Sequence, residues 1–298
     1  MSYLYDKIID LKNNNKIYGP EWLFDNAVYV CQMGSVAYGV SNNVSDIDVY
    51  GITIPPLSDM FPHLRGDIMG FSTTIKPFGV YSHDHIINDD CVYDVAVYGI
   101  IKYFRLLLDN NPNIIDSIFV PDRCVLHIDD VGTNIRNNRH EFLSNKIIPK
   151  IKGYAYSQLS NLQNKKDITN PKRKELVEKF GYDVKFAYQC VRILLEGEQI
   201  VKEGTLDIEK NSELLIGIRN GDWTFDYFEK WVQQKLTEYE DFQTISKLPI
   251  EIDESIIKSL LMECIEMKYG SISKIQILNP EVSNIINDMQ LLIKKYNQ

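Results

Sequence analysis

The stretch from Gly34 to Asp48, GSVAYGVSNNVSDID, constrains the fold of this 298-residue chain more than any other segment. It separates two apolar segments, residues 26–33 and 49–55, which contain several β-branched side chains. Apolar runs of this length, bounded by turn residues or prolines, are typical of buried strands. The sequence therefore predicts two strands joined by a Gly-Ser turn and a polar loop.

Two aspartates, Asp46 and Asp48, stand at the start of the second predicted strand. Residues two apart in a strand point to the same face, so the two carboxylates would lie side by side. Like charges this close are unfavourable unless a cation lies between them, and Mg²⁺ bound by carboxylates and phosphate oxygens meets that need. Gly34 and Ser35 offer backbone N–H groups and a hydroxyl at a strand end, which suits a triphosphate. An EF-hand does not fit, because its glycine and distal glutamate are missing.

This arrangement resembles a known superfamily. A Gly-Ser pair, a spacer of about ten residues and an Asp-x-Asp flanked by apolar residues form the signature of the DNA polymerase β-like nucleotidyltransferases. Within it, the chain is similar to predicted bacterial and phage nucleotidyltransferases that carry GSxAYG followed by SDxDxxG. The resemblance covers roughly residues 25–230 and includes three later segments: residues 94–103 leading to Asn111-Pro112, residues 153–155, and residues 181–197.

The resemblance and the sequence pattern together imply an α+β fold. Residues 1–125 alternate short predicted strands with polar turns, which fits an N-terminal polymerase β-like mixed sheet with helices. Residues 126–298 show helical periodicity and are expected to form an α-helical domain that completes the nucleotide and acceptor cleft. Predicted helices in this part include residues 173–197 and 280–296. In the N-terminal part, two further strands are expected near residues 68–74 and 78–83.

Nucleotidyl transfer at such a site uses two metal ions about 3.5–4 Å apart, held by three carboxylates. The resemblance implies that Asp46 and Asp48 are the first two catalytic metal ligands and that the third lies on a later strand. Asp94 is the best match, since it precedes a predicted helix over residues 97–109. Asp89 and Asp90 are its rivals and are expected to lie in a solvated turn. The expected cofactor is Mg²⁺, two ions, with Mn²⁺ as a substitute.

The same resemblance implies a set of nucleotide contacts. Gly34 and Ser35 would contact the β and γ phosphates. For Tyr38 two roles are left open, packing against the turn and contact with the ligand. On the helix over residues 181–197, three side chains share one side and would face the metal site across the cleft. The alternative is an ordinary charged exposed stripe. These three residues are Lys185, Tyr188 (or Gln189) and Arg192.

Two further polar segments have a weaker link to function. His83-Asp84-His85 is expected to be a solvated loop, because no other histidine has the spacing of a zinc site. The basic residues between Lys165 and Lys174 are either a solvated loop or a local groove for nucleic acid. The net charge of −9 argues against broad non-specific nucleic-acid binding, which depends on neutralising phosphates.

The composition indicates a globular cytoplasmic protein. Five scattered cysteines, none in a CxxC pair, disfavour structural zinc and a disulfide framework. The N-terminal residues carry acidic side chains and read as a short amphipathic helix rather than a signal peptide. Apolar runs are too short to span a membrane, so no membrane contact is expected.

The sequence predicts a Mg²⁺-dependent nucleotidyltransferase of the 2.7.7 type. It would move a nucleoside monophosphate from an NTP to an acceptor and release pyrophosphate. The acceptor is left open among an RNA 3′ end, a protein hydroxyl and a small molecule, as are the preferred NTP and the oligomeric state. The alternative is a nucleotide-binding regulatory or antitoxin-like module without turnover.

Overall fold

The computed structural model describes residues 3–41, 46–66, 68, 77–163 and 171–271. Its centre is a five-stranded sheet in the order β3-β4-β2-β1-β5. Neighbouring strands are antiparallel except β2 and β4, which are parallel, so the sheet is mixed. The strands are β1 (Ala27–Gln32), β2 (Ile47–Thr53), β3 (Val80–Asn88), β4 (Cys91–Gly99) and β5 (Val125–Ile128).

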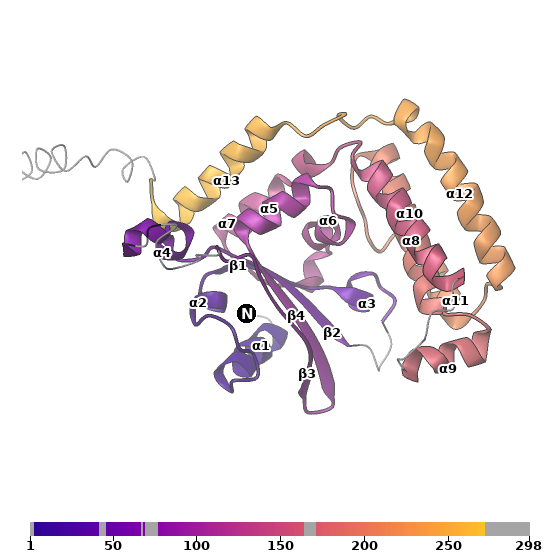
Figure 1. The fold of residues 1–298 in the computed structure, drawn as a ribbon, viewed down its shortest axis with the longest axis horizontal. Coiled ribbons are helices and arrows are strands. Elements are labelled where there is room, and N and C mark those ends of the chain that lie inside the picture. Colours follow the sequence, from indigo (N-terminus) through magenta and orange to yellow (C-terminus); the bar gives the residue numbers. More distant parts are fainter. Residues whose placement is uncertain (1–2, 42–45, 67, 69–76, 164–170, 272–298) are drawn as a thin grey trace, which may run out of the picture.

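Each face of the sheet packs against a different set of helices (Figure 1). On one face, α1 (Tyr3–Asn13) and α2 (Trp22–Asp25) form a small core with alternate residues of β4. The other face joins a much larger core that runs into the helices of the second half of the chain. This arrangement confirms the predicted α+β class.

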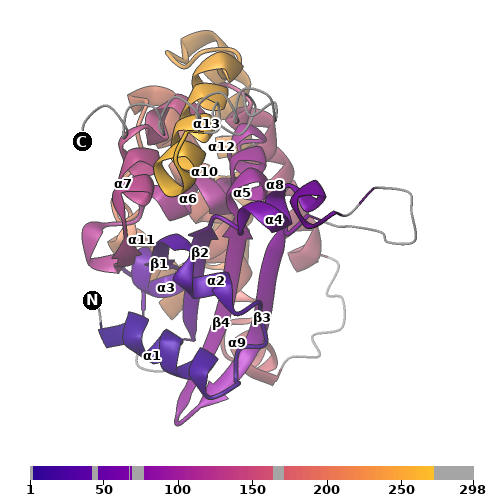
Figure 2. The same ribbon diagram turned by 90° about the vertical axis from the view of Figure 1, so that its left-hand side faces the viewer.

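Figures 1 and 2 show α5, α6, α7 and α13 gathered at one end of the strands, with α8, α10 and α12 standing beside the sheet. The helices that follow α2 are α3 (Gly34–Ala37), α4 (Leu57–Met60), α5 (Ile100–Leu108), α6 (Pro112–Phe119), α7 (Asp130–Asn137), α8 (Ile147–Gln163), α9 (Pro171–Phe180), α10 (Val184–Glu203), α11 (Ser212–Asn220), α12 (Phe225–Ile245) and α13 (Glu254–Tyr269). Short 3₁₀ helices are η1 (Pro62–Arg65), η2 (Asp122–Cys124) and η3 (Arg139–Phe142).

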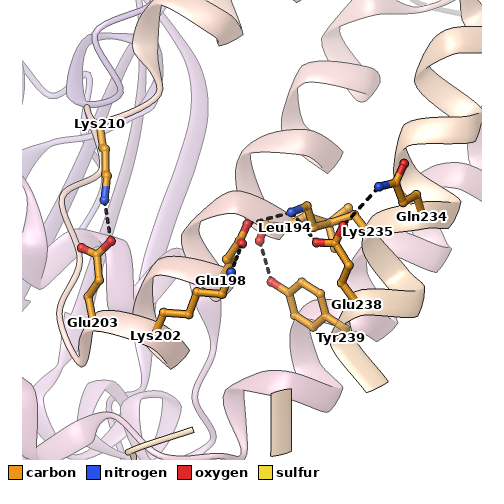
Figure 3. A network of polar contacts seen from close by, with 9 residues as sticks. All are labelled: Leu194, Glu198, Lys202, Glu203, Lys210, Gln234, Lys235, Glu238 and Tyr239. Carbon is orange, nitrogen blue, oxygen red and sulfur yellow. Dashed lines mark hydrogen bonds and ion pairs between the residues drawn. The ribbon is translucent and has the colours of Figure 1, made fainter. Parts of the chain in front are cut away.

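A polar network holds α10 against α12 (Figure 3). The Lys235 ammonium lies 2.9 Å from a Glu198 oxygen on α10 and 2.7 Å from a Glu238 oxygen on its own helix. The Tyr239 hydroxyl donates to the Leu194 carbonyl at 2.6 Å. The contacts fix one side of α10 and leave its N-terminal end beside α9 and α11 (Figure 1).

Two predicted helices differ from the structure in their limits. The helix expected over residues 97–109 begins at Ile100, because β4 continues to Gly99 and remains paired with β2. The helix expected over residues 173–197 is two helices, α9 and α10. They are separated at Gly181, which has a φ of 81°, and at Asp183, whose carboxylate accepts hydrogen bonds from the first turn of α10.

The domain boundary predicted at residue 125 falls at the first residue of β5, which pairs with β1. Helix α13 also contacts the segment that follows β2, since the Tyr269 hydroxyl lies within hydrogen-bonding distance of the Ile54 and Pro55 carbonyls. The division into two domains stays a prediction. Residues 69–74 of the strand predicted over 68–74 lie outside the described residues, as do the helix predicted over 280–296 and residues 165–170 of the basic segment.

Candidate functional site

Two carboxylates meet where β2 and β4 run side by side. The strands pair in parallel with Asp48 directly opposite Asp94. Parallel strands lie about 4.8 Å apart and directly paired residues point to the same face. Asp94 thus lies in the middle of β4 rather than at its end, and its neighbour is one of the two acids of the Asp-x-Asp motif.

Charge repulsion and burial both act on this pair. The pKa of the Asp48 carboxyl is raised from 3.8 to about 6, first by burial and next by the charge of Asp94. Asp46, half-buried and one residue before β2, raises it further, as does Asp84 of β3. The Lys185 ammonium lowers it. Four acids from three segments therefore share one electrostatic environment with a single opposing lysine among the causes of the shift.

The Gly-Ser turn touches this site through Gly34. This residue has a φ of 67°, and a Cβ on it would lie 1.7 Å from Oδ2 of Asp48. The Met33 N–H also donates to the Asp48 carbonyl at 2.8 Å. Only glycine combines this backbone angle with this approach. Ser35 follows in α3 and is half-buried.

Asp94 has a partner that sequence reasoning missed. The backbone N–H of His85 donates to Oδ1 of Asp94 at 2.7 Å. The interpretation of His83-Asp84-His85 as a solvated loop is wrong, because all three residues belong to strand β3. The strand predicted near residues 78–83 therefore continues through Asp84 and His85 to Asn88, and the polar character of this triplet concealed the continuation.

Lys185 is exposed in the first turn of α10, and its charge reaches Asp48. The turn that carries it is fixed by Asp183, whose side chain is 4% exposed and accepts from the Lys185 and Phe186 N–H groups. Arg173 of α9 lies 3.7 Å from the same carboxylate. Lys185 is the one residue of the predicted helical triad that the structure brings into the electrostatic range of the carboxylates.

Tyr38 and Arg192 lie in a buried ion cluster instead. The Arg192 guanidinium, 4% exposed, contacts Asp116 at 2.6 Å and Glu196 at 2.9 Å. It also stacks over the Tyr38 ring at 4.0 Å, and the Tyr38 hydroxyl donates to Asp116 at 2.9 Å. This placement differs from the expected triphosphate contact, because Nη1 of Arg192 already donates to two buried acidic side chains. The spacing of four between Arg192 and Glu196 was the available signal for a helical ion pair.

Tyr188 also differs from the expected ligand contact. Its side chain is 5% exposed, and the Arg219 guanidinium lies over its ring at 5.2 Å. Arg219 in turn donates to the Val40 carbonyl just after the GSVAYG motif. Tyr188 and Arg219 therefore connect α10 and α11 to the segment that follows the Gly-Ser turn.

The carboxylates do not form a complete metal cage by themselves. Within the part of the chain that the structure describes, no group of three or more His, Cys, Asp or Glu residues is arranged to hold an ion. The donor chemistry nonetheless fits Mg²⁺, which prefers carboxylate oxygens and takes its remaining ligands from water and substrate phosphates. The raised pKa of Asp48 identifies the place where a cation would relieve the repulsion.

The mixed sheet, the Gly-Ser turn and the paired carboxylates place the protein in the class of polymerase β-like nucleotidyltransferases. Residues 6–258 match the model of a family described as RlaP, the RNA repair pathway DNA polymerase beta family. Since the match spans most of the chain, the chain belongs to this family. The family implies a nucleotide substrate.

Other comparisons add little. No curated protein matches the sequence. A solved structure of a nucleotidyltransferase-like protein from Exiguobacterium sibiricum 255-15 aligns over 86% of this chain and 79% of its own, with 9% identity. Its TM-score is 0.28, so it carries no weight for fold or function. No described helix has the length and apolar character needed to cross a membrane.

Proposed function

We propose that this protein is a Mg²⁺-dependent nucleotidyltransferase that adds a nucleoside monophosphate from an NTP to the 3′ end of an RNA. The single observation that carries the reaction is the in-register Asp48–Asp94 pair beside Gly34, with the raised pKa of Asp48. Perturbed carboxylates that lack a full set of counter-charges are typical of functional sites. The choice of RNA is supported by the family description, which names an RNA repair pathway.

Asp46, Asp48 and Asp94 would hold the metal, with Mn²⁺ able to replace Mg²⁺. When bound, the cation neutralises charge on the phosphates and on the attacking and leaving oxygens. Asp46 and Asp48 would bind the metal ion on the side of the nucleotide. Asp94, on the neighbouring strand, would bind the metal ion on the side of the acceptor hydroxyl.

The chain's own groups bind and orient the triphosphate. Gly34 and Ser35 would approach the phosphates with backbone N–H groups and one hydroxyl. Lys185 would bind the outer phosphates, because its ammonium already acts on Asp48 and remains exposed. In the transfer, the RNA 3′ hydroxyl would lose its proton to water and its oxygen would bond to the α phosphorus. The bond from the α phosphorus to the oxygen that bridges it to the β phosphate would break, and pyrophosphate would leave.

The acceptor strand would approach from the side of α9. This helix carries Arg173, Lys174 and Lys179, and it lies next to the N-terminal end of α10 (Figure 1). Cationic side chains near the site would contact RNA phosphates despite the negative net charge of the whole chain. A local contact of this kind fits the end of a strand better than a long duplex.

Incubation with each α-³²P-labelled NTP, Mg²⁺ and a short RNA tests the proposal. Label in RNA, lost when the 3′ hydroxyl is blocked, is the expected result. Label in the protein itself would indicate that the acceptor is a protein hydroxyl and not an RNA 3′ end. Thermal stabilisation by Mg²⁺ and NTP without any labelled product would favour the regulatory module over the enzyme.

A further inference from the structure

The edge strand β3 is irregular at the point where it faces Asp94. Its pairing with β4 runs regularly from Val80 to His83 and again from Ile86 to Asn88, but the register shifts between the two parts. In the shift, Asp84 and His85 both lie opposite Asp94. Two residues against one define a β-bulge, and bulges next to active sites often redirect a side chain.

His85 adopts a backbone conformation that side chains rarely take. Its φ is 61°, in the left-handed region that few non-glycine residues adopt; asparagine, aspartate and histidine tolerate it best, and β-branched residues tolerate it worst. In this conformation its N–H points to Oδ1 of Asp94 at 2.7 Å, and the imidazole Nδ1 lies farther away, at 4.0 Å. The imidazole itself is 80% exposed. Backbone strain of this kind persists where the surrounding structure enforces it.

A regular strand would create a different environment. If the register of Val80–His83 continued, Asp84 would lie directly opposite Asp94 on the same face. Two carboxylates directly opposed across strands destabilise the pairing. The bulge instead places an N–H donor beside Asp94, while Asp84 stays near enough to raise the pKa of Asp48.

We propose that the Asp84–His85 bulge is a positioning device that orients the Asp94 carboxylate through the backbone N–H of His85 and not through its imidazole. The hydrogen bond occupies Oδ1 and thereby constrains the direction of the second carboxylate oxygen. This inference rests on the proposed function, since it assigns Asp94 to the acceptor-side metal. His85 is a positioning residue and contacts no reacting atom.

Three substitutions separate the backbone from the side chain. His85→Gly and His85→Val both remove the imidazole, but only glycine accepts the positive φ without strain. His85→Gly should keep wild-type kcat, whereas His85→Val should lower kcat by about 10–100-fold, as changes to residues that orient a metal ligand do. NTP affinity should be unchanged in both. Asparagine also tolerates this conformation, so His85→Asn should keep most of the wild-type kcat.

The matched control is Asp89→Val. Asp89 lies in the turn of the same hairpin and has a φ of 52°, so this change imposes similar strain away from Asp94. It should lower thermal stability about as much as His85→Val without lowering kcat. A loss of kcat in Asp89→Val would mean that general loosening of the hairpin explains the effect.

A second readout does not depend on turnover. Mn²⁺ titration by electron paramagnetic resonance, in the presence of a non-hydrolysable NTP, should count one ion fewer in His85→Val than in wild type and His85→Gly. Equal loss in the glycine and valine variants, in rate or in ion count, would overturn the proposal and assign the role to the imidazole. Wild-type rate and ion count in His85→Val would overturn it as well. If wild type shows the expected ion counts but no transfer, the proposed reaction fails while the positioning role stands.

Discussion

The molecule contains two groups of crowded carboxylates that solve the same electrostatic problem in different ways. In the buried ion cluster, Asp116 and Glu196 are compensated by the Arg192 guanidinium at hydrogen-bonding distance. At the β2–β4 pair, Asp48 and Asp94 face one another, and Lys185 lowers the pKa of Asp48 without any described hydrogen bond to it. In the first arrangement the counter-charge is a protein side chain, whereas in the second a bound cation would relieve the repulsion.

This difference separates a structural role from a functional one. Burial raises the pKa of the Glu196 carboxyl well above its usual range even with Arg192 beside it, so burial makes the charged form of this side chain costly. Its partners are all protein groups, and it connects Tyr38 of the GSVAYG motif to α10. Asp48 borders the glycine turn, and the charge that shifts its pKa most is that of another acid, Asp94.

The largest effect is expected at the metal pair. Asp48→Asn should lower transfer by several orders of magnitude, because the metal loses a charged ligand. The control is Asp90→Asn, which changes an exposed acid in the β3–β4 turn. Both are measured with labelled NTP and RNA. Near-normal transfer by Asp48→Asn would remove this pair from the catalytic assignment.

In the buried ion cluster, the loss should appear in stability. Arg192→Ala leaves the buried acidic side chains of Asp116 and Glu196 without their cation and should lower the free energy of unfolding by about 3–5 kcal/mol. Glu196→Gln should change the free energy of unfolding little, since burial disfavours the charged form of this carboxyl and raises its pKa. Urea unfolding followed by circular dichroism checks both. If Arg192→Ala folds with unchanged stability but binds NTP weakly, Arg192 belongs to the nucleotide site after all.

The sequence predicted the local parts of the site and missed the parts that depend on distant pairing. β1, β2 and the Gly-Ser turn follow from apolar runs and turn residues close together in the chain. The neighbourhood of Asp48 and Asp94 depends on which strand pairs with β2, and no local pattern determines that. The bulge at His85 was missed for the same reason, because a polar triplet looks alike in a loop and in an edge strand. Burial of Arg192 likewise depends on α6 packing against α10 through Asp116.

The pH dependence of stability should distinguish the two groups next. The folded-state pKa of Asp48, about 6, is above its ordinary value of 3.8, so the folded protein binds more protons between these pH values. Stability therefore falls as pH rises through about 6, and ionised Asp48 costs up to about 3 kcal/mol at pH 8. Asp48→Asn should be more stable than wild type at pH 8 and equal to it at pH 4. Mg²⁺ should reduce this difference at pH 8.

Gly34→Ala should have a moderate effect that links the turn to the carboxylate. A Cβ at this position meets Oδ2 of Asp48, so the carboxylate must rotate, and the positive φ adds strain of about 1–3 kcal/mol. Gly66→Ala is the control, since it has a φ of 82° but no atom within 4 Å of the added Cβ. Thermal unfolding and Mg²⁺–NTP titration compare the two. Only Gly34→Ala should weaken nucleotide binding.

The smallest effect is expected at Lys185, where a single exposed charge faces the site. Lys185→Ala should weaken Mg²⁺–NTP binding by about tenfold, roughly 1.4 kcal/mol, and the loss should shrink as salt screens the charge. Lys202→Ala is the matched control, because Lys202 lies on the last turn of the same helix and pairs with Glu198 at 2.5 Å. Isothermal titration at two ionic strengths compares the variants. Equal affinities for wild type and Lys185→Ala at low salt would show that α10 does not contact the triphosphate, and the carboxylate pair would then bind its nucleotide without help from the helical half.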